Sequence, residues 1–158
     1  MIFHLSIAAD DPERTARILA EIWQGSAYPF PPFARGAWIV MAGDGRNSAI
    51  EVYPRGTEMH AAEGDDPVRC QTGRPIRYGP CHSAIATPLE ADQVLAIARR
   101  NGLIAKACDR GPFSVIELWI DGCCLFEVLT EEMQADYLRN MTIEGWEGYL
   151  AGSVQAAA

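Results

Sequence analysis

Basic residues are scarce in this sequence. Its 158 residues include 13 Lys and Arg against 21 Asp and Glu, which gives a formal net charge of −8. Binding to a nucleic-acid backbone or to an anionic membrane surface depends mainly on clustered positive charge. The sequence therefore argues against nucleic acid and membrane as partners. It does not exclude a small anionic ligand, which needs only one or two arginines.

Long apolar segments and paired cysteine motifs are also missing. No apolar run approaches the roughly 20 residues that a membrane helix needs, and the N-terminus lacks the basic and then apolar pattern of a signal peptide. The five cysteines form no Cys-x-x-Cys pair, so a zinc knuckle or a thioredoxin-like site has no support. We expect a cytoplasmic protein. At 49% hydrophobic and 22% charged residues, the chain has an ordinary globular composition for one domain of this length.

An internal repeat is the main positive feature of the sequence. The apolar segments 2–8 and 81–86 each carry one histidine, His4 and His82. Each is followed by a helix signal and later by a glycine turn and an apolar segment with one glutamate, Glu51 or Glu127. The histidine and the glutamate are 47 residues apart in the first copy and 45 in the second. Matching polar residues in a repeat indicate a shared structural or chemical role.

Each copy is predicted to fold as a β-α-β-β-β module. The modules span about 1–56 and 78–130 and are joined by a linker at 57–77, and together they form one α+β domain over 1–130. The first helix begins at Asp10-Asp11-Pro12 and the second at a capping box formed by Thr87-Pro88-Leu89-Glu90. The second strand of the first module is expected in the proline-rich segment 26–35, as a short edge strand in which proline is tolerated. A helical extension follows at 131–152, and residues 153–158 are expected to be frayed.

The four repeated residues predict a metal site. A buried carboxylate costs several kcal/mol unless it is paired or binds a cation, yet both glutamates lie in apolar strands. Strand periodicity places His4, Glu51, His82 and Glu127 opposite the apolar face of their strands. Two imidazoles and two carboxylates suit a divalent first-row metal (Zn, Ni, Co, Mn or Fe) with positions left open for substrate.

On these residues the chain resembles the vicinal oxygen chelate superfamily, and is most similar to its glyoxalase I-like members. The resemblance covers residues 1–130: His4 near the start, Glu51 after a hairpin, His82 after the linker, and Glu127 shortly after Asp121-Gly122. It implies two modules whose mixed sheet curls around one metal that is held by those four residues. It also implies a homodimer, with the site within one chain or across two.

The resemblance further implies a mechanism. The metal chelates two neighbouring oxygens of a small substrate, and one metal-bound glutamate, either Glu51 or Glu127, acts as the general base. An acidic residue at position 51 favours lyase or isomerase chemistry over that of extradiol dioxygenases. Ala8 and Arg55 stand where glutathione-using glyoxalases carry Arg and Asn, so we do not expect glutathione as cosubstrate.

Arg55, Arg74 and Arg77 are candidates for binding an anionic substrate, against the alternative that they are solvated loop charges. Two other functions remain as alternatives to the lyase or isomerase: an extradiol-type dioxygenase of the same fold, and a non-catalytic, drug-sequestering binding protein. The intact set of four ligands counts against the binding protein.

Overall fold

The structure is a computed structural model that describes residues 2–31, 34–64 and 67–156, with side chains up to residue 151. Module 1 contains one helix and four strands in a mixed sheet of order β1-β4-β3-β2. Its elements are β1 (His4–Ala9), α1 (Pro12–Trp23), β2 (Ser26–Pro29), β3 (Trp38–Met41) and β4 (Ala49–Pro54). The predicted start of α1 is confirmed, because Asp11 caps the helix through the backbone N–H of Arg14 and Pro12 occupies its first turn.

Module 2 repeats this arrangement, with sheet order β7-β10-β9-β8. Its elements are β7 (His82–Ala86), α2 (Ala91–Arg100), β8 (Ile104–Asp109), β9 (Ser114–Ile120) and β10 (Cys124–Leu129). The predicted capping box was placed three residues too early, since Glu90 is the N-cap of α2 and Gln93 completes its box. The hydroxyl of Thr87 instead donates to the carbonyl oxygen of Ile22 at the end of α1.

The two βαβββ modules of the prediction are therefore confirmed, but the single curled sheet is not. In each module the first strand pairs in parallel with the last strand and forms an edge of its own four-stranded sheet. Within the described residues no ladder joins the two sheets. The physical reason is the packing of the modules, which meet through their apolar faces and helices.

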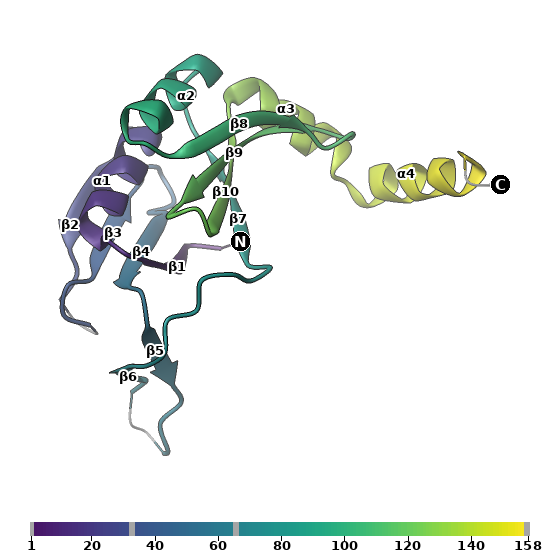
Figure 1. Ribbon diagram of the computed structural model, residues 1–158. Helices are drawn as coiled ribbons and strands as arrows, with labels where there is room; N and C mark the ends of the chain where they lie inside the picture. Colours follow the sequence, from purple (N-terminus) through teal and green to yellow (C-terminus); the bar gives the residue numbers. More distant parts are fainter. Residues whose placement is uncertain (1, 32–33, 65–66, 157–158) are drawn as a thin grey trace.

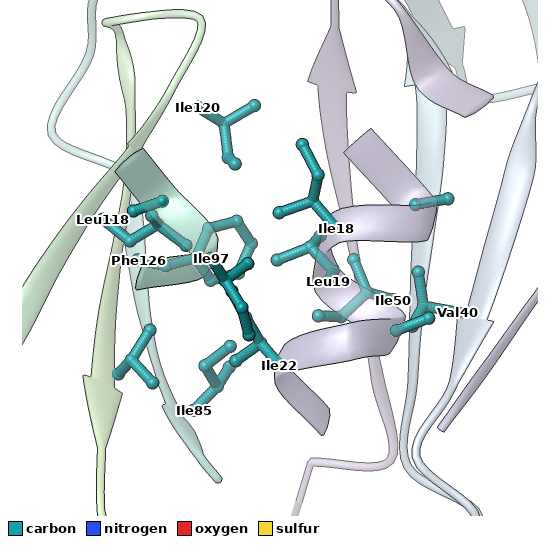
Figure 2. Close-up of a cluster of buried hydrophobic side chains, with 14 of the residues drawn as sticks. Ile18, Leu19, Ile22, Val40, Ile50, Ile85, Ile97, Leu118, Ile120 and Phe126 are labelled. Carbon is teal, nitrogen blue, oxygen red and sulfur yellow. The ribbon is translucent and has the colours of Figure 1, made fainter. Parts of the chain in front are cut away.

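The hydrophobic core lies between the modules, as Figure 2 shows. Ile18 and Leu19 of α1 face Leu118 and Phe126 of the second sheet, while Ile50 of the first sheet lies behind α1. Both sheets thus turn their apolar faces toward this core. The opposite face of each sheet points away from it, and we call these the outer faces of modules 1 and 2.

The linker contains a hairpin that the sequence did not reveal. Strands β5 (Thr57–His60) and β6 (Arg69–Thr72) pair antiparallel in a separate two-stranded sheet. Figure 1 shows this hairpin projecting from the body of the molecule. The alternation of polar and apolar residues that would have predicted these strands is absent, because neither strand buries a face against the core.

Two helices follow module 2, α3 (Glu131–Asn140) and α4 (Ile143–Ala156). Helix α3 lies against β9 and β10, where the rings of Tyr137 and Phe113 meet edge to face. Helix α4 extends away from the modules (Figure 1) and runs into the segment expected to be frayed, of which residues 157–158 lie outside the described residues. No helix in the described parts of the chain is long and apolar enough to span a membrane.

Candidate functional site

The first half of the candidate site lies on the outer face of module 1. In the parallel pair β1–β4, His4 lies opposite Ala49 and Ser6 lies opposite Glu51. His4 and Glu51 therefore share one face at adjacent levels of the ladder. The Nε2 atom of His4 is 3.9 Å from Oε1 of Glu51, and the imidazole is 60% exposed while the carboxylate is 14% exposed.

Two hydroxyl groups fix the orientation of Glu51. Ser6 donates a hydrogen bond of 2.8 Å and Tyr53 one of 3.0 Å, both to Oε2. Burial of Tyr53, reinforced by its bond to Glu51, raises the pKa of that phenol far above its ordinary value, so its hydroxyl remains a donor. The other oxygen, Oε1, faces His4 and can accept a cation. Supporting hydrogen bonds of this kind orient metal ligands in known sites.

The second half of the site repeats this geometry on the outer face of module 2. In the parallel pair β7–β10, His82 lies opposite Leu125 and Ala84 lies opposite Glu127. His82 lies two residues before Ala84, the partner of Glu127, just as His4 lies two residues before the partner of Glu51. Nδ1 of His82 is 3.1 Å from the carbonyl oxygen of Pro80. Because a carbonyl only accepts, Nδ1 carries the proton and the lone pair of Nε2 is available to a metal.

Glu127 differs from Glu51 because its nearest partner is a cation. Arg110, in the turn before β9, donates from Nε to Oε1 of Glu127 at 3.0 Å and from Nη2 to Oε1 of Glu117 at 2.8 Å. Glu117 lies directly opposite Glu127 on the neighbouring strand. Its bonds from Arg110 and from the indole N–H of Trp119 lower the pKa of Glu117 to about 2.

Sequence reasoning missed Arg110 and Glu117, although one signal was available. Glu117 stands in the middle of the apolar strand β9, which is the same anomaly that singled out Glu51 and Glu127. The contact of Arg110 with the two glutamates could not be predicted from a strand pattern. It sits in a turn, and its side chain reaches the site only because the fold brings that turn over the sheet.

Within the described part of one chain, the two halves do not converge into a single four-residue cluster. Because the modules pack through their apolar faces, the outer faces of the two sheets point away from their common core. A cavity of about 800 Å³ between the modules is lined by both His4 and His82, but by neither Glu51 nor Glu127. Among the described residues, no three His, Cys, Asp or Glu side chains converge in a way that could hold a metal ion. The four ligand assignments stay predictions.

Three arginines are predicted to bind an anionic substrate, and that role stays a prediction. Arg55 is 7% exposed and joins Asp10, at 2.5 Å, to Asp121, at 2.6 Å. Arg77 also contacts Asp10, at 2.8 Å, and Arg74 is exposed in the linker. Arg55 thus links the end of β4 to the β9–β10 turn of the other module. It is held by two carboxylates at the junction of the modules.

Comparison with known proteins supports the fold but does not assign an activity. No protein-family model matches the sequence, and no curated protein matches it. Among solved structures, the chain is similar to the fosfomycin resistance protein FosX of Listeria monocytogenes, with a TM-score of 0.55 at 12% identity over 88% of this chain and 97% of that one. A mutant of the same protein complexed with Mn(II) gives a TM-score of 0.53 at 14% identity over 81% and 87% of the chains. A lactoylglutathione lyase from Agrobacterium tumefaciens gives 0.52 at 13% identity over 81% and 91%.

These likenesses extend over most of each chain. Together with the repeated βαβββ topology, they show that the chain has the glyoxalase, bleomycin resistance and dioxygenase fold, which is the vicinal oxygen chelate fold.

Proposed function

We propose that the protein is a divalent-metal-dependent lyase or isomerase of the glyoxalase I type. Its metal ligands are His4, Glu51, His82 and Glu127. The observation that carries the proposal is the repeated register, which sets a histidine and a glutamate on one face at adjacent ladder levels in both modules. Two such half-sites offer two imidazole nitrogens and two carboxylates, a donor set that fits Zn, Ni, Co, Mn or Fe. The Mn(II) complex of FosX gives this metal chemistry a precedent in the same fold.

The complete site is proposed to form between two copies of the chain. Strands β1 and β7 are edge strands with one unpaired side in their sheets, and unpaired edges readily pair with another chain. Ile2 and Phe3, which directly precede β1, are 82% and 59% exposed. In a two-fold dimer, the outer face of module 1 in one copy meets the outer face of module 2 in the other. The symmetry then produces two complete sites and two sheets that curl around them.

A divalent ion held by these residues would supply Lewis-acid chemistry: it would polarise the oxygens of a small vicinal-oxygen substrate and make the adjacent C–H more acidic. Glu51 is the better candidate for the general base. Its partners are the neutral hydroxyls of Ser6 and Tyr53, so it can take up a proton without breaking an ion pair. Protonation of Glu127 would instead break its ion pair with Arg110. Glu51 accordingly accepts the proton from the substrate carbon and returns it to the neighbouring atom.

Metal content tests this proposal most simply. Purified full-length protein is loaded with each of the five metals, dialysed, and assayed by elemental mass spectrometry. We expect a bound divalent metal in the wild type and its loss in His4→Ala and in Glu127→Ala. His60→Ala is the matched control, because His60 contacts Glu58 and Gln71 on the projecting hairpin and should leave the metal content unchanged. Equal metal content in all four proteins would refute the proposed ligands. Oxygen uptake that depends on Fe(II) would indicate the dioxygenase instead.

A further inference from the structure

The outer faces of the two modules carry different chemistry at equivalent positions. Along one row of module 1, the neighbours of Glu51 across the sheet are Ile39 and then Tyr28. Along the equivalent row of module 2, the neighbours of Glu127 are Glu117 and then Lys106. One wall of a site built from both faces is therefore apolar and aromatic, and the other is charged.

The charged row is built around Arg110. Its guanidinium lies between the two carboxylates, with Nη2 at 2.8 Å from Glu117 and at 2.9 Å from Glu127. Nζ of Lys106, the only lysine in the sequence, is 3.6 Å from the second oxygen of Glu117. Trp119 donates to that oxygen as well. Glu117 is thus contacted by Arg110, Lys106 and Trp119, and it holds both cations in place beside Glu127.

The net charge of this cluster changes when Glu127 binds a metal ion. In the free chain two cations face two carboxylates, so the cluster is neutral. If a metal ion neutralises the charge of Glu127, the charge of Glu117 alone remains to balance those of Arg110 and Lys106. The cluster then carries one excess positive charge, in a protein whose net charge is −8. Guanidinium groups recognise oxyanions through paired N–H donors, and an Arg held by a neighbouring carboxylate is already oriented to do so.

We propose that Arg110 and Lys106, held by Glu117, form the subsite for an anionic group of the substrate. This inference rests on the proposed function, because it places the subsite next to the metal ligand Glu127. The substrate class is then a small molecule with an oxyanionic group, such as a phosphate, phosphonate or carboxylate, and an uncharged part that faces Ile39 and Tyr28. Arg110 and Lys106 are the residues of this subsite that select for negative charge, whereas Arg55 is bound to Asp10 and Asp121 at the junction of the modules.

The test uses inorganic phosphate as the probe and the full-length, metal-free protein. Glu127→Gln removes the charge that a metal would neutralise, so it frees the subsite without any metal. Phosphate binding is followed by NMR at low ionic strength through the indole N–H of Trp119, which bonds Glu117. We expect Glu127→Gln to bind phosphate at least about tenfold more tightly than the wild type, because the competing carboxylate charge is gone.

The arginine is then removed in the Glu127→Gln background. Arg110→Gln should weaken phosphate binding by at least about tenfold, and Lys106→Gln by a few-fold, because Lys106 is 64% exposed. Arg99→Gln is the matched control, since it removes one positive charge from the exposed last turn of α2 and should change nothing. Should Arg110→Gln fold poorly, Arg110→Lys is the alternative, because it keeps the positive charge but loses the paired N–H donors of the guanidinium. We expect it to bind phosphate several-fold more weakly than the Glu127→Gln protein. Phosphate affinity that is the same with Arg, Gln or Lys at this position would overturn the inference.

The two proposals fail in distinguishable ways. A wild-type protein that binds no divalent metal contradicts the proposed function and leaves the phosphate measurements on Glu127→Gln unaffected. A protein that binds metal through Glu127, but whose phosphate binding does not depend on Arg110, contradicts only the anion subsite.

Discussion

The buried cation Arg55 links the two modules. Replacing it by methionine measures how much this link contributes to the free energy of unfolding. The Arg55 side chain is 7% exposed and bonds Asp121, which is 10% exposed, at 2.6 Å. Its second partner, Asp10, is 44% exposed, so solvent screens that contact. The methionine variant keeps an aliphatic chain of similar length but leaves Asp121 as a buried charge without its cation.

Breaking a buried ion pair by removing one partner costs about 3 to 5 kcal/mol. We expect the lower value, about 3 kcal/mol, because Asp121 keeps a bond of 2.7 Å from the backbone N–H of Asp10. For a chain of 158 residues this corresponds to a fall in Tm of roughly 9 °C. Urea unfolding followed by circular dichroism measures the free energy directly.

A double variant separates two effects: the loss of the Arg55–Asp121 ion pair and the burial of an unpaired Asp121 carboxylate. In the double variant Arg55→Met/Asp121→Asn the buried charge is gone, so we expect at least about 1 kcal/mol of stability to return. Arg139→Met is the control. Arg139 is 68% exposed in a pair with Asp136 on α3, and its loss should cost under about 0.5 kcal/mol. An Arg55→Met protein as stable as Arg139→Met would refute the reasoning.

Three further predictions concern single positions. The lowered pKa of Glu117, about 2, means that its ionised form stabilises the fold above about pH 5 and that this contribution is lost as the pH falls from about 5 toward 2; Glu117→Gln should lower stability by on the order of 2 kcal/mol at pH 7, and by progressively less in unfolding experiments at lower pH. Gly25→Ala would place a Cβ 2.2 Å from the carbonyl oxygen of Met41, so we expect a loss of about 1–3 kcal/mol in urea unfolding, whereas Gly45→Ala, with open space around it, should be nearly neutral. Tyr53→Phe removes one of two hydroxyls that orient the carboxylate of module 1 and should weaken metal binding roughly tenfold in a competition titration, and an unchanged affinity would argue against an orienting role.

The modules could be predicted from the sequence because apolar and polar residues alternate along their strands and glycine-containing turns separate those strands. Strand β4 shows why: Ile50 and Val52 are fully buried while Glu51 faces outward, and the alternation is visible in the residue types. The equivalence of His4 and His82 followed from the same pattern, and the register places both two residues before the partner of a glutamate.

Other features depend on contacts between segments that are distant in the sequence. Thr87 looked like an N-cap, but its hydroxyl bonds the carbonyl oxygen of Ile22 in the other module, and Glu90 caps α2 instead. The sequence offers Arg55 as a substrate ligand or as a solvated loop charge, and it does not reveal that the side chain is 7% exposed and bonds two carboxylates at the module junction. Local patterns also do not say whether the two sheets of one chain curl toward each other or pack back to back, because both arrangements bury the same apolar residues.

The central claim is that each metal site takes its ligands from two copies of the chain, and mixing two defective variants tests it most directly. One variant lacks the ligands of module 1 (His4→Ala/Glu51→Ala) and the other lacks those of module 2 (His82→Ala/Glu127→Ala). Each alone should bind no metal. When the two are unfolded and refolded together in equal amounts, half of the dimers are mixed and each mixed dimer holds one intact site, so about one quarter of the wild-type metal content should return. A refolded mixture of mixed dimers that remains free of metal would contradict a site shared between two copies.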